Sequence, residues 1–240
     1  MNTPQLQRKQ IADNGFAVIP NVYNAEEIDA IANTIATAQH NTSNFRKTDD
    51  LFAIRQLFKE VPGLQQLIFT DKLKTIVGDL FGEDYFLVKS IYFDKPGNSN
   101  WFVAYHQDLT ISVDKKTAVE GFSNWTVKNG QFAVQPPLEI LQNNFTIRIH
   151  LDDTDGDNGA LKVIQSSHKK NIYRAEEIDY SAEVEVTCNV PAGGVMIMKP
   201  LLMHASNRTV NNKNRRVIHI EFSNAELPEE IKWAERLTAL

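Results

Sequence analysis

The sequence predicts an α+β protein in which a helical layer precedes a core of β-strands. Apolar residues recur at helical spacing in the first third of the chain, whereas short β-rich runs bounded by turn residues fill the part from Tyr85 to Ser223. Helices followed by many short strands indicate an α+β architecture with an all-β core. The candidate functional residues His106 and His204 lie early and late in this core. A jelly roll brings early and late strands together, so we favour it over a simple sandwich.

The composition indicates one sizeable core and limits the classes of partner. A chain of 240 residues with 42% hydrophobic content can form a single domain, and we expect one domain over residues 1–240. The net charge of −5 and the pI of 5.7 offer no basic surface for nucleic acid. The single cysteine, Cys188, fits a reducing compartment, and the polar N-terminus and short apolar runs predict neither secretion nor a membrane span. We therefore expect a cytoplasmic protein.

The helical layer is predicted over about residues 1–82. Asn24 can cap a helix and Glu27 can complete a capping box, after which Ile28, Ile31 and Ile35 follow at helical spacing. The elements expected here are a helix over 1–15 that ends at Gly15, a strand over 15–20, a helix from 24 to about 39, a loop over 40–50, and helices over 51–60 and 71–81.

The jelly-roll core is predicted over about residues 85–223. The strands expected are 86–93, 145–151, 161–164, 183–190, 195–199 and 216–223, and residues 101–105 lead into the extended segment around His106. Residues 111–144 form a long connection rich in turn residues, which is uncommon inside a compact domain unless it is functional. A helix over about 228–237 is expected to end the chain.

A candidate metal site lies in the stretch Tyr105–Leu109. His106 and Asp108 are two residues apart on an extended segment, so they face the same side and can hold one metal ion together. With His204 as a third ligand they form the two-histidine, one-carboxylate set of non-haem Fe(II) oxygenases. The alternatives are a surface turn with a salt bridge for His106 and Asp108, and a structural histidine for His204.

A series of motifs supports this interpretation. In chain order they are Gly15–Pro20, His106-Gln107-Asp108, Leu151-Asp152-Asp153 with Asn158–Leu161, Ser166-Ser167-His168, Pro191-Ala192-Gly193, and His204–Asn207 with Arg215. Together they resemble the phytanoyl-CoA dioxygenase (PhyH) family of Fe(II)- and 2-oxoglutarate-dependent oxygenases. The resemblance implies a double-stranded β-helix core, jelly-roll or cupin-like, with Fe(II), 2-oxoglutarate and O2 as cofactors. It also implies that iron is held by His106, Asp108 and His204, and the distal carboxylate of 2-oxoglutarate by Arg215 and Ser206.

Other basic and polar residues are candidates for the co-substrate site. Arg215 and Arg216 are neighbours on a strand, so one of them can point inward, and the spacing in the family favours Arg215. Arg148 alternates with apolar residues; it lies either on a solvated face or in the iron cavity, where it would meet an anionic group of 2-oxoglutarate or of the substrate. Many family members carry a tryptophan near Arg148, so this arginine is a departure. Gln107, between two ligands, is a further candidate contact of 2-oxoglutarate.

The aromatic residues of the 111–144 connection are candidates for a substrate lid. Phe122, Trp125 and Phe132 could close over the metal and exclude water, or could belong to a flap that only covers the sheet. His40, His168 and His219 are assigned structural roles.

The function predicted is hydroxylation of an unactivated C–H bond of a small molecule, with release of succinate and CO2. Related halogenases replace the metal-binding carboxylate with a small residue, whereas Asp108 is present here, so hydroxylation, desaturation or cyclisation is favoured. The alternatives are a cupin-type enzyme that does not use 2-oxoglutarate and a non-catalytic jelly roll that binds a metabolite. No nucleic-acid or membrane partner is expected, and the sequence leaves the primary substrate and the oligomeric state open.

Overall fold

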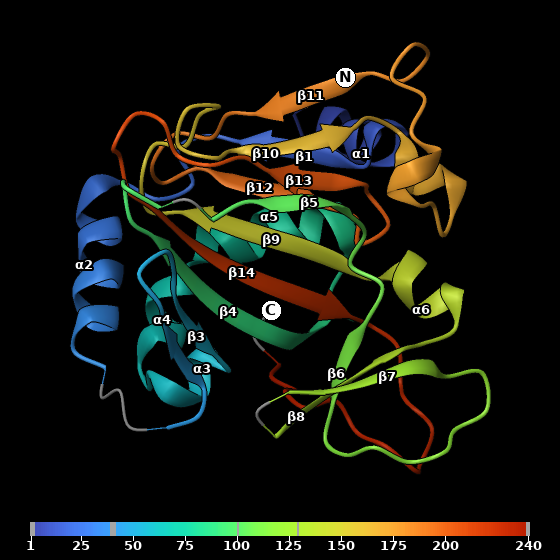
Figure 1. The fold of residues 1–240 in the computed structure, drawn as a ribbon. Coiled ribbons are helices and arrows are strands. Elements are labelled where there is room, and N and C mark those ends of the chain that lie inside the picture. The colour runs from blue at the N-terminus through green and yellow to red at the C-terminus, as the bar shows by residue number, and fades with distance from the viewer. Residues whose placement is uncertain (1–2, 39–41, 100, 129, 239–240) are drawn as a thin grey trace.

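The computed structural model describes residues 3–38, 42–99, 101–128 and 130–238 (Figure 1). The helices are α1 (Thr3–Asn14), α2 (Ala25–Ala36), α3 (Leu57–Glu60), α4 (Leu64–Ile68), α5 (Asp71–Phe81) and α6 (Leu138–Asn143). The strands are β1 (Phe16–Ile19), β2 (Phe45–Lys47), β3 (Phe52–Arg55), β4 (Phe86–Lys95), β5 (Val103–His106), β6 (Ile111–Val113), β7 (Ser123–Lys128), β8 (Gln131–Gln135), β9 (Phe145–His150), β10 (Leu161–Ile164), β11 (Glu185–Cys188), β12 (Val195–Met198), β13 (His204–Ser206) and β14 (Arg215–Ser223). The 3₁₀ turns η1 (Ser167–Lys170) and η2 (Ala175–Glu177) complete the set.

Two antiparallel sheets form a jelly-roll core. The main sheet has seven strands in the order β1-β12-β9-β14-β4-β3-β2, and the second sheet has four in the order β11-β10-β13-β5. Neighbours in the main sheet come from distant parts of the chain, as β14 pairs with both β9 and β4. This confirms the predicted fold class.

The outer face of the main sheet packs against the N-terminal helices (Figure 1). Ile147 and Ile149 on β9 and Ile218 and Ile220 on β14 are buried in one cluster with apolar residues of α1, α2, α4 and α5. Each fully buried isoleucine side chain stabilises the fold by about 1.5–3 kcal/mol. Because side chains alternate along a strand, the intervening residues face the opposite way, toward the second sheet.

The N-terminal helices follow the local signals in the sequence. α2 begins with the expected capping box, in which Asn24 and Glu27 exchange backbone-to-side-chain hydrogen bonds of 2.9 and 2.7 Å. α5 spans Asp71–Phe81 as predicted, and Thr70 caps its first turn. α1 ends before Gly15, whose positive φ of 88° suits glycine.

Two expectations for residues 40–60 were wrong. Residues 51–60 form β3 and the short helix α3 in place of one helix, and β2 lies inside the predicted loop. Gln56 has a left-handed φ of 50°, which separates strand from helix, while β3 pairs along β4. The strand predicted over 15–20 is present as β1, and β2 and β3 add two further strands of the main sheet to the N-terminal part. His40 lies outside the described residues.

The 111–144 connection is ordered structure. Its strands form a three-stranded sheet in the order β6-β8-β7, followed by α6. In Figure 1 this small sheet projects beyond the end of β14. Phe132 and Ala133 of β8 pair with both β6 and β7. The many turn residues of this stretch obscured its strands in the sequence.

The C-terminal helix predicted over 228–237 is wrong, because this segment is extended. Its backbone bonds to two sheets: Ala234 N donates to Ser112 O at 3.0 Å, and Leu237 exchanges hydrogen bonds with Leu87. Trp233 is buried and its indole N–H donates to Ala225 O at 3.0 Å. These tertiary partners override the local helical pattern. Within the described ranges, no helix combines the length and apolar character that crossing a membrane requires.

Candidate metal centre

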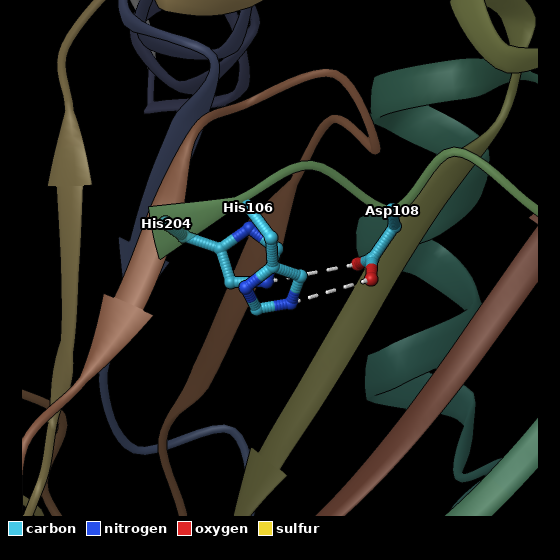
Figure 2. A group of neighbouring side chains, drawn as sticks. All are labelled: His106, Asp108 and His204. Carbon is cyan, nitrogen blue, oxygen red and sulfur yellow. Dashed lines mark ion pairs between the residues drawn. The ribbon is translucent and has the colours of Figure 1, made fainter. Parts of the chain in front are cut away.

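The second sheet brings the three predicted metal ligands together. His106 ends β5 and His204 begins β13, and the two residues face each other directly across the strand pair. Asp108 lies just after β5, where its backbone N–H donates to Pro200 O at 3.0 Å. Their ligand atoms all lie within 4.8 Å of one another, and the imidazoles and the carboxylate point to a common centre (Figure 2). Nε2 of His106 is 4.0 Å from Asp108 Oδ1, and Nε2 of His204 is 3.8 Å from Oδ2.

Backbone carbonyls fix which nitrogen of each histidine faces this centre. Nδ1 of His106 lies 2.8 Å from Ala104 O, and Nδ1 of His204 lies 2.9 Å from Leu202 O. A carbonyl oxygen can only accept, so both Nδ1 atoms carry the proton and both Nε2 atoms present a lone pair. This orientation is typical of metal-ligating histidines.

The charge states also suit a metal. Burial lowers the pKa of His204 to about 4, although the charge of Asp108 opposes this shift. Burial alone would raise the pKa of Asp108, but the charges of His204, His219 and Lys89 hold it at about 2. Near neutral pH, His204 is neutral and Asp108 is ionised, as metal binding requires. Asp108 Oδ2 is buried and has no hydrogen-bond partner among the described residues, which a cation would supply. The donor set therefore fits Fe(II).

The ligands open into a cavity of about 280 Å³ between the two sheets. Arg215, Arg148 and Ser206 line it and are buried. Nη1 of Arg215 and Oγ of Ser206 both donate to Gly159 O, the latter at 2.9 Å. The Nε atoms of Arg215 and Arg148 are buried without a partner within the described part of the chain. Such guanidinium donors suit an incoming carboxylate, so the cavity also fits 2-oxoglutarate.

Arg148 points into this cavity from β9, which excludes a solvated position. Every residue of β9 is buried, and Nη1 of Arg148 lies 3.1 Å from Nδ1 of His219 on the adjacent strand. Burial lowers the pKa of Arg148 to about 10, and burial together with the charge of Arg148 lowers that of Arg215 to about 9. Both remain cationic at neutral pH. Arg216 points away and forms a bidentate ion pair with Asp152.

The sequence profile of the phytanoyl-CoA dioxygenase (PhyH) family matches residues 11–217. The chain belongs to the PhyH family. It is therefore a member of a family of oxygenases that use Fe(II), 2-oxoglutarate and O2, in agreement with the site described above. Comparison with curated protein sequences gives no match.

Several solved structures are similar in fold to this member of the PhyH family. EctD from S. alaskensis superposes with a TM-score of 0.70 at 17% identity, covering 93% of this chain and 77% of EctD. HygX from Streptomyces hygroscopicus, solved with nickel and 2-oxoglutarate, gives 0.65 at 17% identity, covering 91% and 86% of the two chains. SnoK, a carbocyclase from nogalamycin biosynthesis, gives 0.66 at 15% identity, covering 94% and 85%. At these identities the similarity establishes the fold alone.

The predicted contact between Gln107 and 2-oxoglutarate is wrong. Gln107 lies between two ligands on an extended segment, so its side chain points away from the cavity. Its Nε2 donates to Leu201 O at 2.6 Å and to Asn171 O at 2.8 Å, while its Oε1 accepts from Tyr173 N. The amide supports the loop behind the metal ligands.

The predicted lid aromatics do not line the metal cavity. Phe122, Trp125 and Phe132 pack against the apolar cluster between the small sheet and the C-terminal segment. Phe122 and Trp125 border a surface hollow formed with residues 116–120, and Phe132 borders a second cavity beside the metal cavity. The structure thus favours the structural flap for Phe122 and Trp125.

His219 and Lys89 line the cavity and are linked through Glu221, an arrangement that the sequence patterns did not predict. His219 accepts from Arg148 through Nδ1, so its Nε2 carries the proton and donates to Glu221 Oε1 at 3.0 Å. Glu221 also binds Lys89 Nζ at 2.7 Å. The structural role expected for His219 was too narrow, since His219 lines the metal cavity and holds Arg148. Side chains alternate along a strand, so His219 and Glu221 share the face of β14 on which Arg215 lies. This pattern would have predicted that both point the same way as Arg215. His168 remains outside the cavity, with its Nε2 3.2 Å from Ala12 O.

Proposed function

We propose that this protein hydroxylates an unactivated C–H bond of a small molecule, consuming O2 and 2-oxoglutarate and releasing succinate and CO2. The observation that carries the proposal is the convergence of His106, Asp108 and His204 in one cavity with the unpaired guanidinium donor of Arg215. We also propose that the whole chain forms one catalytic domain, acts in the cytoplasm, and needs neither nucleic acid nor a membrane.

Each cavity residue has a defined task in this proposal. The Nε2 atoms of His106 and His204 and the carboxylate of Asp108 hold Fe(II), which together with 2-oxoglutarate supplies the oxidant. Arg215 binds the distal carboxylate of 2-oxoglutarate, because the Gly159 carbonyl already orients its guanidinium. The Ser206 hydroxyl shares that carbonyl and can rotate to donate to the same carboxylate.

Arg148 is assigned to an anionic group nearer the metal. Its guanidinium interacts with the charge of Asp108, and His219 holds it in place. In Arg148→Lys the planar fork is lost while the charge is kept, so we expect weaker 2-oxoglutarate binding or slower turnover. Unchanged turnover together with unchanged co-substrate affinity would remove Arg148 from the mechanism.

The decisive experiment is anaerobic titration of the protein with Fe(II) and 2-oxoglutarate. Chelation of 2-oxoglutarate by iron gives a visible charge-transfer band, which a cupin-type enzyme that does not use 2-oxoglutarate would lack. Arg215→Lys should weaken the titration, whereas Arg216→Lys is the matched control, since Arg216 pairs with Asp152 outside the cavity. Absence of the band in the wild-type protein would reject the proposal.

Product analysis separates hydroxylation from related outcomes. The retained carboxylate of Asp108 favours hydroxylation over halogenation, but the fold also occurs in SnoK and in the epimerase SnoN. A substrate screen should therefore follow succinate release and the mass of the product. Addition of one oxygen atom supports hydroxylation, loss of two hydrogens indicates desaturation or cyclisation, and no succinate with any compound favours a metabolite-binding role.

A further inference from the structure

A second pair of arginines lines the metal cavity at the edge of the main sheet. Arg46 on β2 pairs directly with Ala53 on β3, and Arg55 lies two residues further along β3. Directly opposed residues share a face, and so do residues two apart on a strand. Arg46, Ala53 and Arg55 therefore face the same way, and all three line the cavity.

These two guanidiniums have no acidic counterpart in the described part of the chain. Within the described ranges, neither Arg46 nor Arg55 forms an ion pair or a side-chain hydrogen bond with a carboxylate. Burial lowers the pKa of Arg55, and the positive charge of Arg46 lowers it further. Two cations held half-buried beside each other repel, and an anion bound between them relieves that cost.

The pair is separate from the arginines assigned to the co-substrate. Arg148, His219, Ile91 and Arg55 lie opposite one another on β9, β14, β4 and β3. Three strand spacings place the Cα atoms of Arg148 and Arg55 roughly 14 Å apart. Arg148 interacts with Asp108 and Arg215, whereas Arg55 interacts with Arg46. Lys89, which also lines the cavity, is already paired with Glu221.

Space for a larger ligand continues past this pair. A second cavity of about 160 Å³ shares Arg55, Lys89 and Ile91 with the metal cavity. Its far wall includes Gln131 and Phe132 of β8 in the small sheet. Arg55 thus stands where the two cavities meet.

We propose that the primary substrate carries a carboxylate or phosphate group, which Arg46 and Arg55 bind while an apolar part of the substrate extends toward the metal. The apolar part would lie along Ile91 and Phe93, which line the same face of β4. This proposal rests on the proposed oxygenase function, and it specifies the chemical class of the primary substrate.

The first test measures anion binding without turnover. The protein is saturated with nickel and 2-oxoglutarate and titrated calorimetrically with benzoate, phenylphosphonate or the neutral benzamide. We expect at least one of the two anions, benzoate or phenylphosphonate, to bind at a single site. Benzamide should bind at least about tenfold more weakly than that anion. Arg46→Gln and Arg55→Gln should each weaken anion binding by about tenfold or more. Lys47→Gln removes a charge from the exposed side of the same strand and should change nothing.

The preference between benzoate and phenylphosphonate identifies the anionic group. Binding of neither anion, equal binding of benzamide, or binding unchanged in both arginine variants would overturn the proposal.

The second test separates this proposal from the oxygenase assignment. In the anaerobic Fe(II) titration, Arg46→Gln and Arg55→Gln should keep the charge-transfer band, with a half-saturating 2-oxoglutarate concentration within about twofold of wild type. Equal losses of 2-oxoglutarate and anion affinity would show that these arginines serve the co-substrate and would overturn the proposal. A wild-type protein without the band would reject the oxygenase function, and the calorimetry would still report anion binding.

Discussion

The carbonyl of Gly159 anchors both residues assigned to the distal carboxylate of 2-oxoglutarate, so Gly159→Ala is an informative perturbation. Gly159 has a φ of 87°, which strains any residue with a Cβ. A Cβ at this position would lie 2.8 Å from Asn207 O, 2.9 Å from Lys95 Nζ and 3.3 Å from Ser206 Oγ. Alanine therefore forces the backbone to move, and the carbonyl that orients Arg215 moves with it.

The magnitude follows from the strain and the contact that is lost. A residue in a sparsely populated backbone region costs about 1–3 kcal/mol. A hydrogen bond to a charged group contributes about 1.5–3 kcal/mol. If Arg215 loses its anchor, 2-oxoglutarate binding should weaken by about ten- to a hundredfold. The metal ligands come from β5 and β13 and should still bind metal.

The assay is the anaerobic charge-transfer titration at saturating Fe(II), with metal affinity measured separately. Gly156→Ala is a matched control in the same turn, because its Cβ would meet only Thr187 Cγ2, at an ordinary 3.7 Å. We expect Gly156→Ala to bind 2-oxoglutarate as wild type does. A folded Gly159→Ala protein with wild-type affinity for 2-oxoglutarate would refute the anchoring role of this carbonyl.

Four further outcomes are expected. Arg215→Lys keeps the charge but loses the planar fork, so the Kd of 2-oxoglutarate in the same titration should rise about tenfold or more. Asp108→Ala removes a ligand, and competition with a metal chelator should show a loss in affinity of more than about a hundredfold. The pKa of His204 is lowered from 6.5 to about 4, so the unfolded chain binds a proton first as the pH falls. The free energy of unfolding of the metal-free protein should then decrease from pH 6.5 to 4, and urea titrations of His204→Gln should show a shallower decrease. Trp233→Ala should cost about 3–5 kcal/mol in urea unfolding, because this side chain fills the cluster under the small sheet.

The sequence located the metal ligands because local geometry places two of them. His106 and Asp108 share a face by strand alternation, and the same alternation, applied to Gln107, would have directed that side chain away from the metal. The prediction of His204 and Arg215 depended on the order of the family motifs, because no local pattern shows that β13 lies beside β5. The pairing of distant strands is what places them in one cavity.

The errors in the fold have a common physical origin. Residues 51–60 and 228–237 contain apolar residues at spacings that suit a helix, yet their backbone groups find partners in strands far away in the chain. β3 pairs with β4, and Leu237 pairs with Leu87. These partners stabilise the extended structure through hydrogen bonds and burial. Local sequence propensity does not include these long-range contributions, so it cannot predict them. By contrast, α2 and α5 have their own N-terminal caps, and the residues at which they begin were predictable.

The two sheets divide the tasks of the site in a way that bears on substrate choice. The second sheet supplies the candidate metal-binding histidines, whereas the cations that line the cavity stand on alternate residues of the main sheet. Arg148 and Arg215 lie on its central strands β9 and β14, beside the metal ligands, and Arg46 and Arg55 lie on the edge hairpin β2–β3. An edge hairpin pairs on one side only, so its side chains can change without disturbing the strands that hold the iron site. Under the proposed function, the candidate metal ligands of the second sheet act together with Arg148 and Arg215 at the centre of the main sheet. The proposed anion site lies at the edge of the main sheet, in a hairpin that the sequence patterns had assigned to a loop and a helix.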